Sequence, residues 1–430
     1  MPEPSTPSRD GVDQTGSAEP DKAAHGSLIA IAIGVMNVAT YGFTIVAARA
    51  LGPQQYGAFA AVMNLLVVVS VASLALQATA ARRIASTPGD VKEIEDGVRR
   101  VTLRAALGLG GVLLLAAPLV NVALRLESLV TAALVGLVAV PLTIMGGQAG
   151  ILQGERRWRP LAMLYVAAGV PRLVVGTALI LWRPEELTAT VGVLVGALAP
   201  VAVGWWALRE RGHVGHDRTS ADHGNRALVR ETLRNSQALL AFFAVSNVDI
   251  IIARNVLADV ESGLYAGGLI LTKAMLFLPQ FVVVLAFPDM ADNAARRRAL
   301  RLSLGLVGVL GVVGVAASYL LSGVALVFVG GDDYADVQGR LWLFAVLGTL
   351  LSMIQLLVYA LLAQESGRMV LLPWAALAII TAVAATVADS IGSLLAVVVT
   401  VDAVLLLVLL VPALLRAPAP DRGPTGAPST

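Results

Sequence analysis

Four ionisable side chains lie deep inside long apolar runs of the sequence. They are Arg172, Asp249, Lys273 and Asp402. A charged group within a membrane-spanning helix costs about 3 kcal/mol or more, so each is a candidate functional residue. A guanidinium presents a planar fork to phosphate oxygens, and a lysine ammonium adds a point charge. The two cations therefore predict a cleft that binds an anionic group such as phosphate or pyrophosphate.

Two arginines nearer the predicted outer boundary, Arg49 and Arg254, are further candidates for this cationic cleft. Snorkelling to the interface also explains Arg49, as it does Arg340. Arg254 follows Asp249 by five residues, which is about 140° around a helix, so the two cannot face each other. We expect Asp249 to pair with a cation on a neighbouring helix. Asp249 and Asp402 are the candidate charge partners or coupling residues, although a structural salt bridge explains Asp402 equally well.

The composition is that of an integral membrane protein. Among 430 residues 57% are hydrophobic and 14% are charged, and the mean hydropathy is +0.79. Uninterrupted apolar runs favour helices over the alternating strands of a barrel. The formal net charge is +2 with basic residues gathered in loops, which does not indicate nucleic-acid binding. The absence of cysteine excludes disulfides, thiolate catalysis and cysteine metal sites.

Twelve apolar runs predict an all-α fold with about twelve transmembrane helices in two parallel six-helix bundles around a central cleft. The first six runs cover residues of about 27–48, 57–80, 101–120, 129–152, 161–181 and 187–208. The second six cover residues of about 236–253, 264–290, 299–319, 338–362, 370–388 and 391–414. The predicted bundles are therefore residues 27–208 and 236–414.

Three polar segments flank these bundles. Residues 1–26 and 415–430 are predicted to be disordered cytoplasmic tails, and the first lacks the apolar core of a signal peptide. Residues 209–235 are predicted to be a cytoplasmic linker. The linker contains His213, His216 and His223, but their spacing follows no helix face, so we interpret them as solvated rather than metal-binding.

Lysine and arginine lie mainly in alternate loops, which sets the orientation. Clusters such as Arg82–Arg83, Arg156–Arg157 and Arg296–Arg298 all follow even-numbered helices, whereas the other loops are richer in acids. By the positive-inside rule both termini are cytoplasmic. We expect the protein in the plasma (inner) membrane. Six helices per half also require the two halves to have the same orientation, which creates a cleft between them.

An internal repeat supports this doubled architecture. The segment RALGPQQYGAF and its weaker copy RNVLADVESGLY each separate two apolar runs. Aligning Leu51 with Leu257 also aligns Gly57 with Gly263, and Phe59 with Tyr265.

These segments also carry a family resemblance over most of residues 27–412. RALGPQQYGAFAAVMNLL with QATAARRIA, then NVDIIIARNVLADVESGLYAGGLILTK, LPQFVVVLAFPDM and VGGDDYADV, resemble bacterial polysaccharide flippases. The resemblance implies membership of the multidrug, oligosaccharidyl-lipid and polysaccharide exporter superfamily. It also implies transfer of an undecaprenyl-pyrophosphate-linked oligosaccharide, in a cationic central cavity. Asp249, Gly263, Tyr265, Pro288 and the turn from Leu51 to Gly57 match the family pattern, whereas the candidate cations rest on the charge argument.

The main functional prediction is thus a non-enzymatic flippase that works by alternating access. The expected partners are the anionic lipid-linked glycan, membrane lipids and other polysaccharide-biosynthesis membrane proteins. No catalytic residue, metal or cofactor is expected, because Walker and HExxH motifs are absent.

Three alternatives remain open. A cation-coupled multidrug antiporter of the same fold usually needs buried acids in its first half, and none is predicted there. A glycan polymerase or ligase commonly uses a large outer loop with arginines, which is missing. A major-facilitator carrier would have a glycine-rich basic signature where this chain has ARRIASTPGD.

Overall fold

The structure is a computed structural model, and it describes residues 19–86, 91–209, 221–276, 296–362 and 371–415. These residues are helical throughout, apart from short turns, and none of them forms a strand. The helices of the first half are α1 (Glu19–Ser86), α2 (Val91–Leu115), α3 (Ala117–Leu124), α4 (Leu129–Gly154), α5 (Trp158–Trp182) and α6 (Glu186–Arg209). The helices of the second half are α7 (Ala221–Val256), α8 (Asp259–Met275), α10 (Arg296–Leu320), α11 (Ser322–Val329), the 3₁₀ helix η1 (Asp332–Arg340), α12 (Leu341–Leu362), α13 (Leu371–Val387) and α14 (Ile391–Leu415).

Helix α1 contains the first two predicted runs, joined by a sharp bend. Gly52 has φ 67° and ψ 171°, which breaks the helix, and Pro53 follows it. A positive φ suits glycine because it has no Cβ, and proline at the start of the second limb needs no hydrogen-bond partner for its nitrogen. The turn that sequence analysis singled out is therefore the point where the chain reverses.

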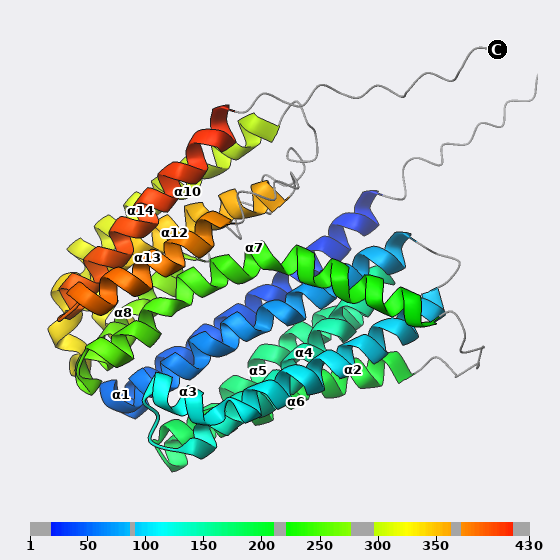
Figure 1. Cartoon of the computed structure of the whole chain (residues 1–430), viewed down its shortest axis with the longest axis horizontal. Helices are drawn as coiled ribbons and strands as arrows, with labels where there is room; N and C mark the ends of the chain where they lie inside the picture. The colour runs from blue at the N-terminus through cyan, green and yellow to red at the C-terminus, as the bar shows by residue number, and fades with distance from the viewer. Residues whose placement is uncertain (1–18, 87–90, 210–220, 277–295, 363–370, 416–430) are drawn as a thin grey trace, which may run out of the picture.

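The described helices pack as two bundles (Figure 1). Helices α2, α4, α5 and α6 pack with α1 and with one another, and α7, α8, α10, α12, α13 and α14 form the second bundle. Helix α1 also packs against α7 and α8, and it is the main contact between the halves. This arrangement confirms the predicted fold of two six-run halves.

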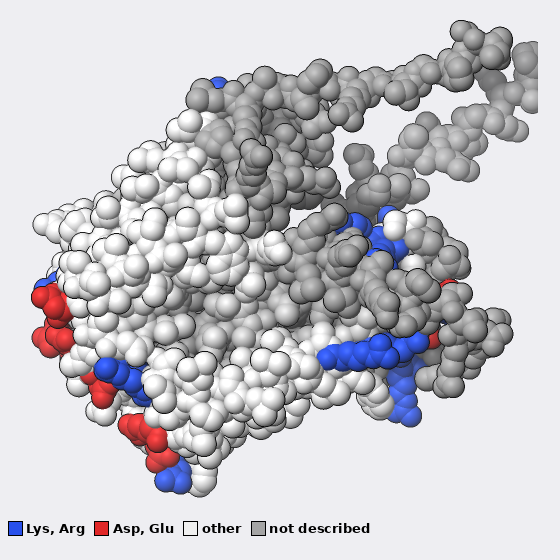
Figure 2. Space-filling view, viewed as in Figure 1, with Lys and Arg blue, Asp and Glu red and all other residues white. Residues whose placement is uncertain are grey.

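The two halves have the same orientation, as predicted. The bend of α1 and the turn between α7 and α8 lie at the same end of the molecule (Figure 1), where a Cβ on Gly57 would lie 2.9 Å from the Cα of Gly263. The glycines that the sequence repeat aligns thus touch each other. We call this the outer end, following the positive-inside prediction. Figure 2 shows acidic side chains mixed with Lys and Arg at this end, and mainly Lys and Arg at the opposite end.

Eight of the described helices are long and apolar enough to cross a membrane, and the bent pair α2–α3 would make nine. The apolar part of α1 has 61 residues, enough for two crossings, whereas α8 and α13 have only 17 residues each. The chain is therefore a multi-pass membrane protein.

Some predicted boundaries differ from those in the structure. Helix α1 begins at Glu19, within the predicted tail, and α7 begins at Ala221, within the predicted linker. The predicted run 101–120 is divided into α2 and α3, which meet at 61° because Pro118 cannot donate a hydrogen bond into the preceding turn. The second part of the run 264–290, including Pro288, lies outside the described residues, as do His213 and His216.

Candidate functional site

Lys273 lies within α8 and is held by the facing helix α7. Its Nζ donates to the carbonyl oxygen of Ser246 and to Oδ1 of Asn247, each at 2.8 Å. The ammonium is only partly buried. Two of its three donors bind neutral groups, so its positive charge is not neutralised by a direct carboxylate contact among the described residues.

Asp249 on α7 is fully buried and hydrogen-bonded. Its Oδ2 accepts from the hydroxyl of Tyr265 at 3.0 Å, and its Oδ1 accepts from the backbone N–H of Ile250 at 2.9 Å. The charge of Lys273 acts on Asp249 through space, but these two residues do not form an ion pair within 4.0 Å. The predicted cation on a neighbouring helix is therefore present, whereas the direct partner is a phenol that the sequence argument did not assign.

Asp402 on α14 lies in the same region, since its charge acts on Tyr265 and the charge of Asp249 acts on Asp402. Its side chain is 0% exposed, and neither carboxylate oxygen has a hydrogen-bond partner. Buried carboxylates are almost always paired, so an unpartnered one is a costly feature of the fold. No described residue forms the structural salt bridge that the sequence left open for Asp402.

Arg172 on α5 is the cation of the first half. Its guanidinium carbon lies 5.9 Å from the centre of the Phe43 ring, and its Nε is buried without a hydrogen-bond partner. Gly196 on α6 makes room for it, because a Cβ there would lie 2.7 Å from the Cα of Arg172. No described residue forms an ion pair with Arg172.

The sequence repeat relates these two charged sites. The offset of 206 residues that aligns Gly57 with Gly263 also aligns Phe43 with Asp249. In the first half the rings of Phe43 and Phe59 pack edge-on at 5.9 Å. In the second half the equivalent pair is the Asp249–Tyr265 hydrogen bond. A contact between two rings thus corresponds to a contact between a carboxylate and a hydroxyl.

The other two candidate cations are placed differently from the prediction. Arg49 donates to the carbonyl oxygen of Val327 on α11 at 2.5 Å. Arg254 is 3% exposed and donates to backbone carbonyls at the end of α3. Both side chains therefore join the two halves at the outer end, and in this structure their donors face protein rather than a ligand.

Two hydroxyls that the charge argument missed also join the two halves, that of Tyr334 at the outer end and that of Tyr41 further along α1. Tyr334 is fully buried, and its hydroxyl donates to the carbonyl oxygen of Ala48 at 3.1 Å. Its ring packs edge-on against Tyr56 at 6.4 Å. Tyr41 donates to the carbonyl oxygen of Ile270 at 3.2 Å. The sequence signal was the short motif VGGDDYADV, which contains Tyr334.

The prediction that the first half contains no buried acid is wrong. Glu186 is 2% exposed and Glu95 is 7% exposed. Glu186 is the first residue of α6, one position before the predicted run, and its Oε1 accepts from the N–H of Glu127 at 3.1 Å. Glu95 lies near the start of α2 and pairs with Arg99 at 2.6 Å. Both acids lie near helix ends, away from the middle of the membrane.

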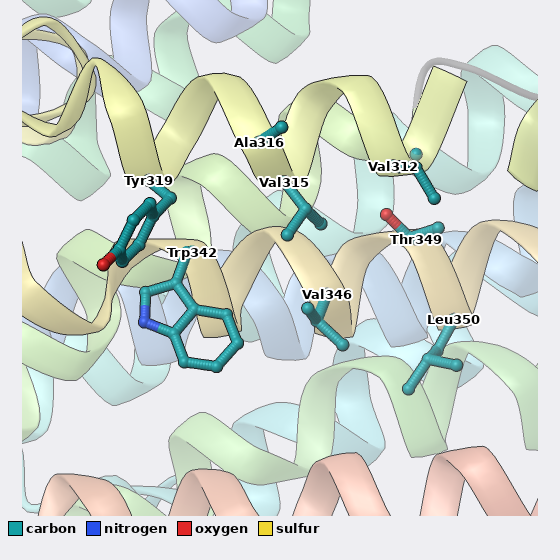
Figure 3. Close-up of a pocket in the computed structure, with 9 residues that line it drawn as sticks. Val312, Val315, Ala316, Tyr319, Trp342, Val346, Thr349 and Leu350 are labelled. Atoms are coloured by element: carbon teal, nitrogen blue, oxygen red, sulfur yellow. The ribbon is translucent and has the colours of Figure 1, made fainter. Parts of the chain in front are cut away.

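A groove of about 540 Å³ lies between α10 and α12 (Figure 3). Its lining is apolar, and Tyr319 and Trp342 lie together at one end. The hydroxyl of Thr349 donates to the carbonyl oxygen of Ala345 at 2.8 Å, so it is already satisfied. No charged side chain lines the groove.

The family of the chain follows from its sequence. The sequence model of the polysaccharide biosynthesis protein family matches residues 23–293, which is more than half of the chain. The chain belongs to this family. No curated protein sequence gives a significant match.

Solved structures show that this member of the polysaccharide biosynthesis protein family shares the fold of known transporters. The lipid II flippase MurJ in an inward closed conformation matches with a TM-score of 0.66 and 12% identity, over 90% of this chain and 87% of that chain. An inward-facing multidrug resistance MATE family transporter of the MOP superfamily matches with a TM-score of 0.65 and 13% identity, over 89% of this chain and 93% of that chain. An outward-facing multidrug resistance MATE family transporter matches with a TM-score of 0.57 and 14% identity, over 90% of this chain and 94% of that chain.

Proposed function

We propose that this protein is a flippase that moves an undecaprenyl-pyrophosphate-linked oligosaccharide, or a related polysaccharide precursor, across the plasma membrane by alternating access. One observation carries the proposal. The membrane-spanning helices hold a cation in each half, Arg172 and Lys273, and no described carboxylate forms an ion pair with either. An intramembrane cation that no carboxylate contacts directly is costly, and a bound anion offsets that cost. In this proposal the pyrophosphate is that anion.

Family membership supports the same substrate class, because the family is one of polysaccharide biosynthesis. Both termini are cytoplasmic in this proposal, and residues 27–208 and 236–414 are the two moving bundles. The glycan crosses between the bundles while the lipid tail stays in the membrane. Other membrane proteins of polysaccharide biosynthesis would supply the substrate and consume the product.

The outer end is closed in the proposed resting state. Contacts of Gly57 with Gly263, of Tyr334 with Ala48 and of Arg49 with Val327 all join the two halves there. The likeness to the inward-facing transporter, at a TM-score of 0.65, exceeds the likeness to the outward-facing one, at 0.57. Substrate would therefore enter from the cytoplasmic side.

Asp249 and Asp402 are the proposed coupling residues. A buried carboxylate with no partner, such as Asp402, is stabilised when it binds a proton or a cation. Tyr265 and Asp249 lie beside it and would respond to that change of charge. This would link an ion gradient to movement of the second bundle.

The proposal is tested in cells that lack the protein, by extracting lipids and determining which leaflet holds the lipid-linked oligosaccharide. We expect single repeat units to accumulate on the cytoplasmic face. Wild-type protein should release them, whereas Arg172→Ala with Lys273→Ala should flip at least about thirtyfold more slowly, since removing one partner of a buried charge pair costs about 2–5 kcal/mol. The double variant Arg172→Lys, Lys273→Arg keeps both charges and should retain more activity than the double alanine variant.

The matched control is Arg183→Ala. Arg183 is exposed at the outer end, and among the described residues its one ion pair is with Glu185, at 3.0 Å, so its loss should leave flipping unchanged. Wild-type flipping by the Arg172→Ala, Lys273→Ala variant would contradict the cationic site. Normal lipid-linked glycan together with sensitivity to cationic drugs would instead support a cation-coupled multidrug antiporter, which the buried pair Asp249 and Asp402 also suits. Unpolymerised units stranded outside would indicate a glycan polymerase.

A further inference from the structure

The C-terminus of α3 is capped by residues from the other half of the protein. The last carbonyl groups of a helix have no partners within the helix. Here Asn255 Nδ2 donates to the carbonyl oxygen of Ala123 at 2.7 Å, and Arg254 Nε donates to that of Leu124 at 2.9 Å. Arg254 Nη2 also donates to the carbonyl oxygen of Arg125. Three consecutive carbonyls of the first half thus receive donors from α7.

The contact is reciprocal. Arg125 Nη2 donates to the backbone carbonyl oxygen of Asn255 at 2.9 Å, one residue before α7 ends. Each helix C-terminus therefore receives an arginine from the opposite half. The C-terminal end of a helix carries partial negative charge, and a cation placed there is stabilising. Arg125 itself has φ 46°, a left-handed conformation that ends α3 and exposes its carbonyl to Arg254.

Arg254 is also held in position from its own half. Its Nη1 donates to Oγ of Ser262 at 3.2 Å and lies 3.5 Å from Oδ1 of Asp259. Both residues belong to the first turn of α8. The guanidinium side chain is 4% exposed, so it is fixed between α8 and α3 rather than free in solvent.

Helix α3 is the short helix of the first half that contacts α7 here. It has eight residues and leaves the axis of α2 at an angle of 61°. The two halves are joined here by side chains of three residues, so separation of the halves at this end must break all of these bonds together. Loss of the caps would also leave the carbonyls of α3 without protein partners, and the carbonyl of Leu124 lies at a buried position where such a loss is costly.

We propose that Arg254 and Asn255 are the latch of the outer gate, and that they hold it closed by capping α3 of the opposite half. Arg254 then acts on the conformational equilibrium and not on the substrate. The inference rests on the proposed function only in taking the halves to separate at their outer end. Removing the latch shifts the population toward an outward-open state before any substrate binds.

The test measures conformation in purified protein without substrate, so its outcome is independent of whether the chain flips a glycan. Since the chain has no cysteine, spin labels can be placed without background at Val130→Cys on α4 and Val260→Cys on α8. Both positions are exposed, on opposite halves near the outer end. Pulsed electron resonance then gives the distribution of distances between the halves.

We expect Arg254→Ala to raise the population of long distances at least about tenfold, because it removes both of the guanidinium donors that bind carbonyls of the first half. Asn255→Ala removes a smaller number of bonds at an exposed position and should give a smaller shift in the same direction. Arg125→Ala removes the bond that the first half donates to the carbonyl oxygen of Asn255, and it should also raise the population of long distances. Arg254→Lys keeps the positive charge but loses the planar guanidinium with its several donors. Its population of long distances should lie between those of the wild type and Arg254→Ala.

Arg183→Ala is again the control, since its ion pair with Glu185 stays within the first half. Should Arg254→Ala fail to fold, Asn255→Ala and Arg125→Ala decide the matter, because neither leaves a buried charge unpaired. Folded Asn255→Ala and Arg125→Ala variants with the distance distribution of the control would overturn the latch.

Discussion

Replacing Gly263 with leucine is expected to abolish transport and to hold the two halves apart at the outer end. A Cβ at this position would overlap the backbone carbonyl of Pro53, and Gly57 packs on the same glycine from the other half. Backbone atoms cannot turn away as a flexible side chain can. Overpacking a close contact costs about 1–3 kcal/mol or more, so the closed state should lose at least about tenfold in population.

Two measurements check this expectation. The leaflet assay should show lipid-linked oligosaccharide retained on the cytoplasmic face, and the labels at Val130→Cys and Val260→Cys should report long distances. Gly308→Leu is the matched control, because nothing lies within 4 Å of a Cβ at that position in α10. A Gly263→Leu protein that transports normally and keeps the closed distances would show that this contact does not close the gate.

Asp402→Asn is expected to make the protein more stable and less active. Asp402 is completely buried with neither oxygen paired, so its charged form opposes folding. Asparagine has nearly the same shape without the charge. We expect the free energy of unfolding to rise by at least about 1 kcal/mol, because an unsatisfied buried charge costs more than an unsatisfied buried amide. Transport should fall at least about tenfold if Asp402 carries the coupling charge.

Thermal unfolding in detergent and the leaflet assay, made on the same preparation, test both parts. Asp389→Asn is the control, because Asp389 is exposed and accepts from Oγ of Ser393 at 3.0 Å. Asp249→Leu should act in the opposite direction on stability, since it removes the partner of the buried Tyr265 hydroxyl. An Asp402→Asn protein that is less stable and fully active would contradict the coupling role.

Much of the fold could be predicted because membrane helices leave a simple signal. About twenty apolar residues are needed for one crossing, so the apolar runs of this length predicted where the membrane-spanning helices lie. Repeat alignment predicted that Gly57 and Gly263 are equivalent, and the structure brings them into contact. The bend between α2 and α3 was missed because Pro118 lies inside an otherwise uniform apolar run.

The candidate site was harder to predict, because it depends on contacts between helices. From the sequence, Arg254 is a cation that could bind an anionic substrate. Only the position of α3 shows that its donors bind backbone carbonyls. Asp249 has a cation nearby as expected, but its direct partner is Tyr265, sixteen residues further along the chain. Glu186 was counted as outside the membrane because the predicted run began one residue later.

The first half has a pair of aromatic rings where the second half has a carboxylate bonded to a hydroxyl. The two halves therefore differ in charge at equivalent positions. Phe43 and Phe59 present only hydrocarbon where Asp249 and Tyr265 present groups that can gain or lose a proton. Among the residues described, the mid-membrane acids therefore lie in the second bundle alone. Under the proposed function, the second bundle would respond to the ion gradient, and the first would be free to change with the glycan.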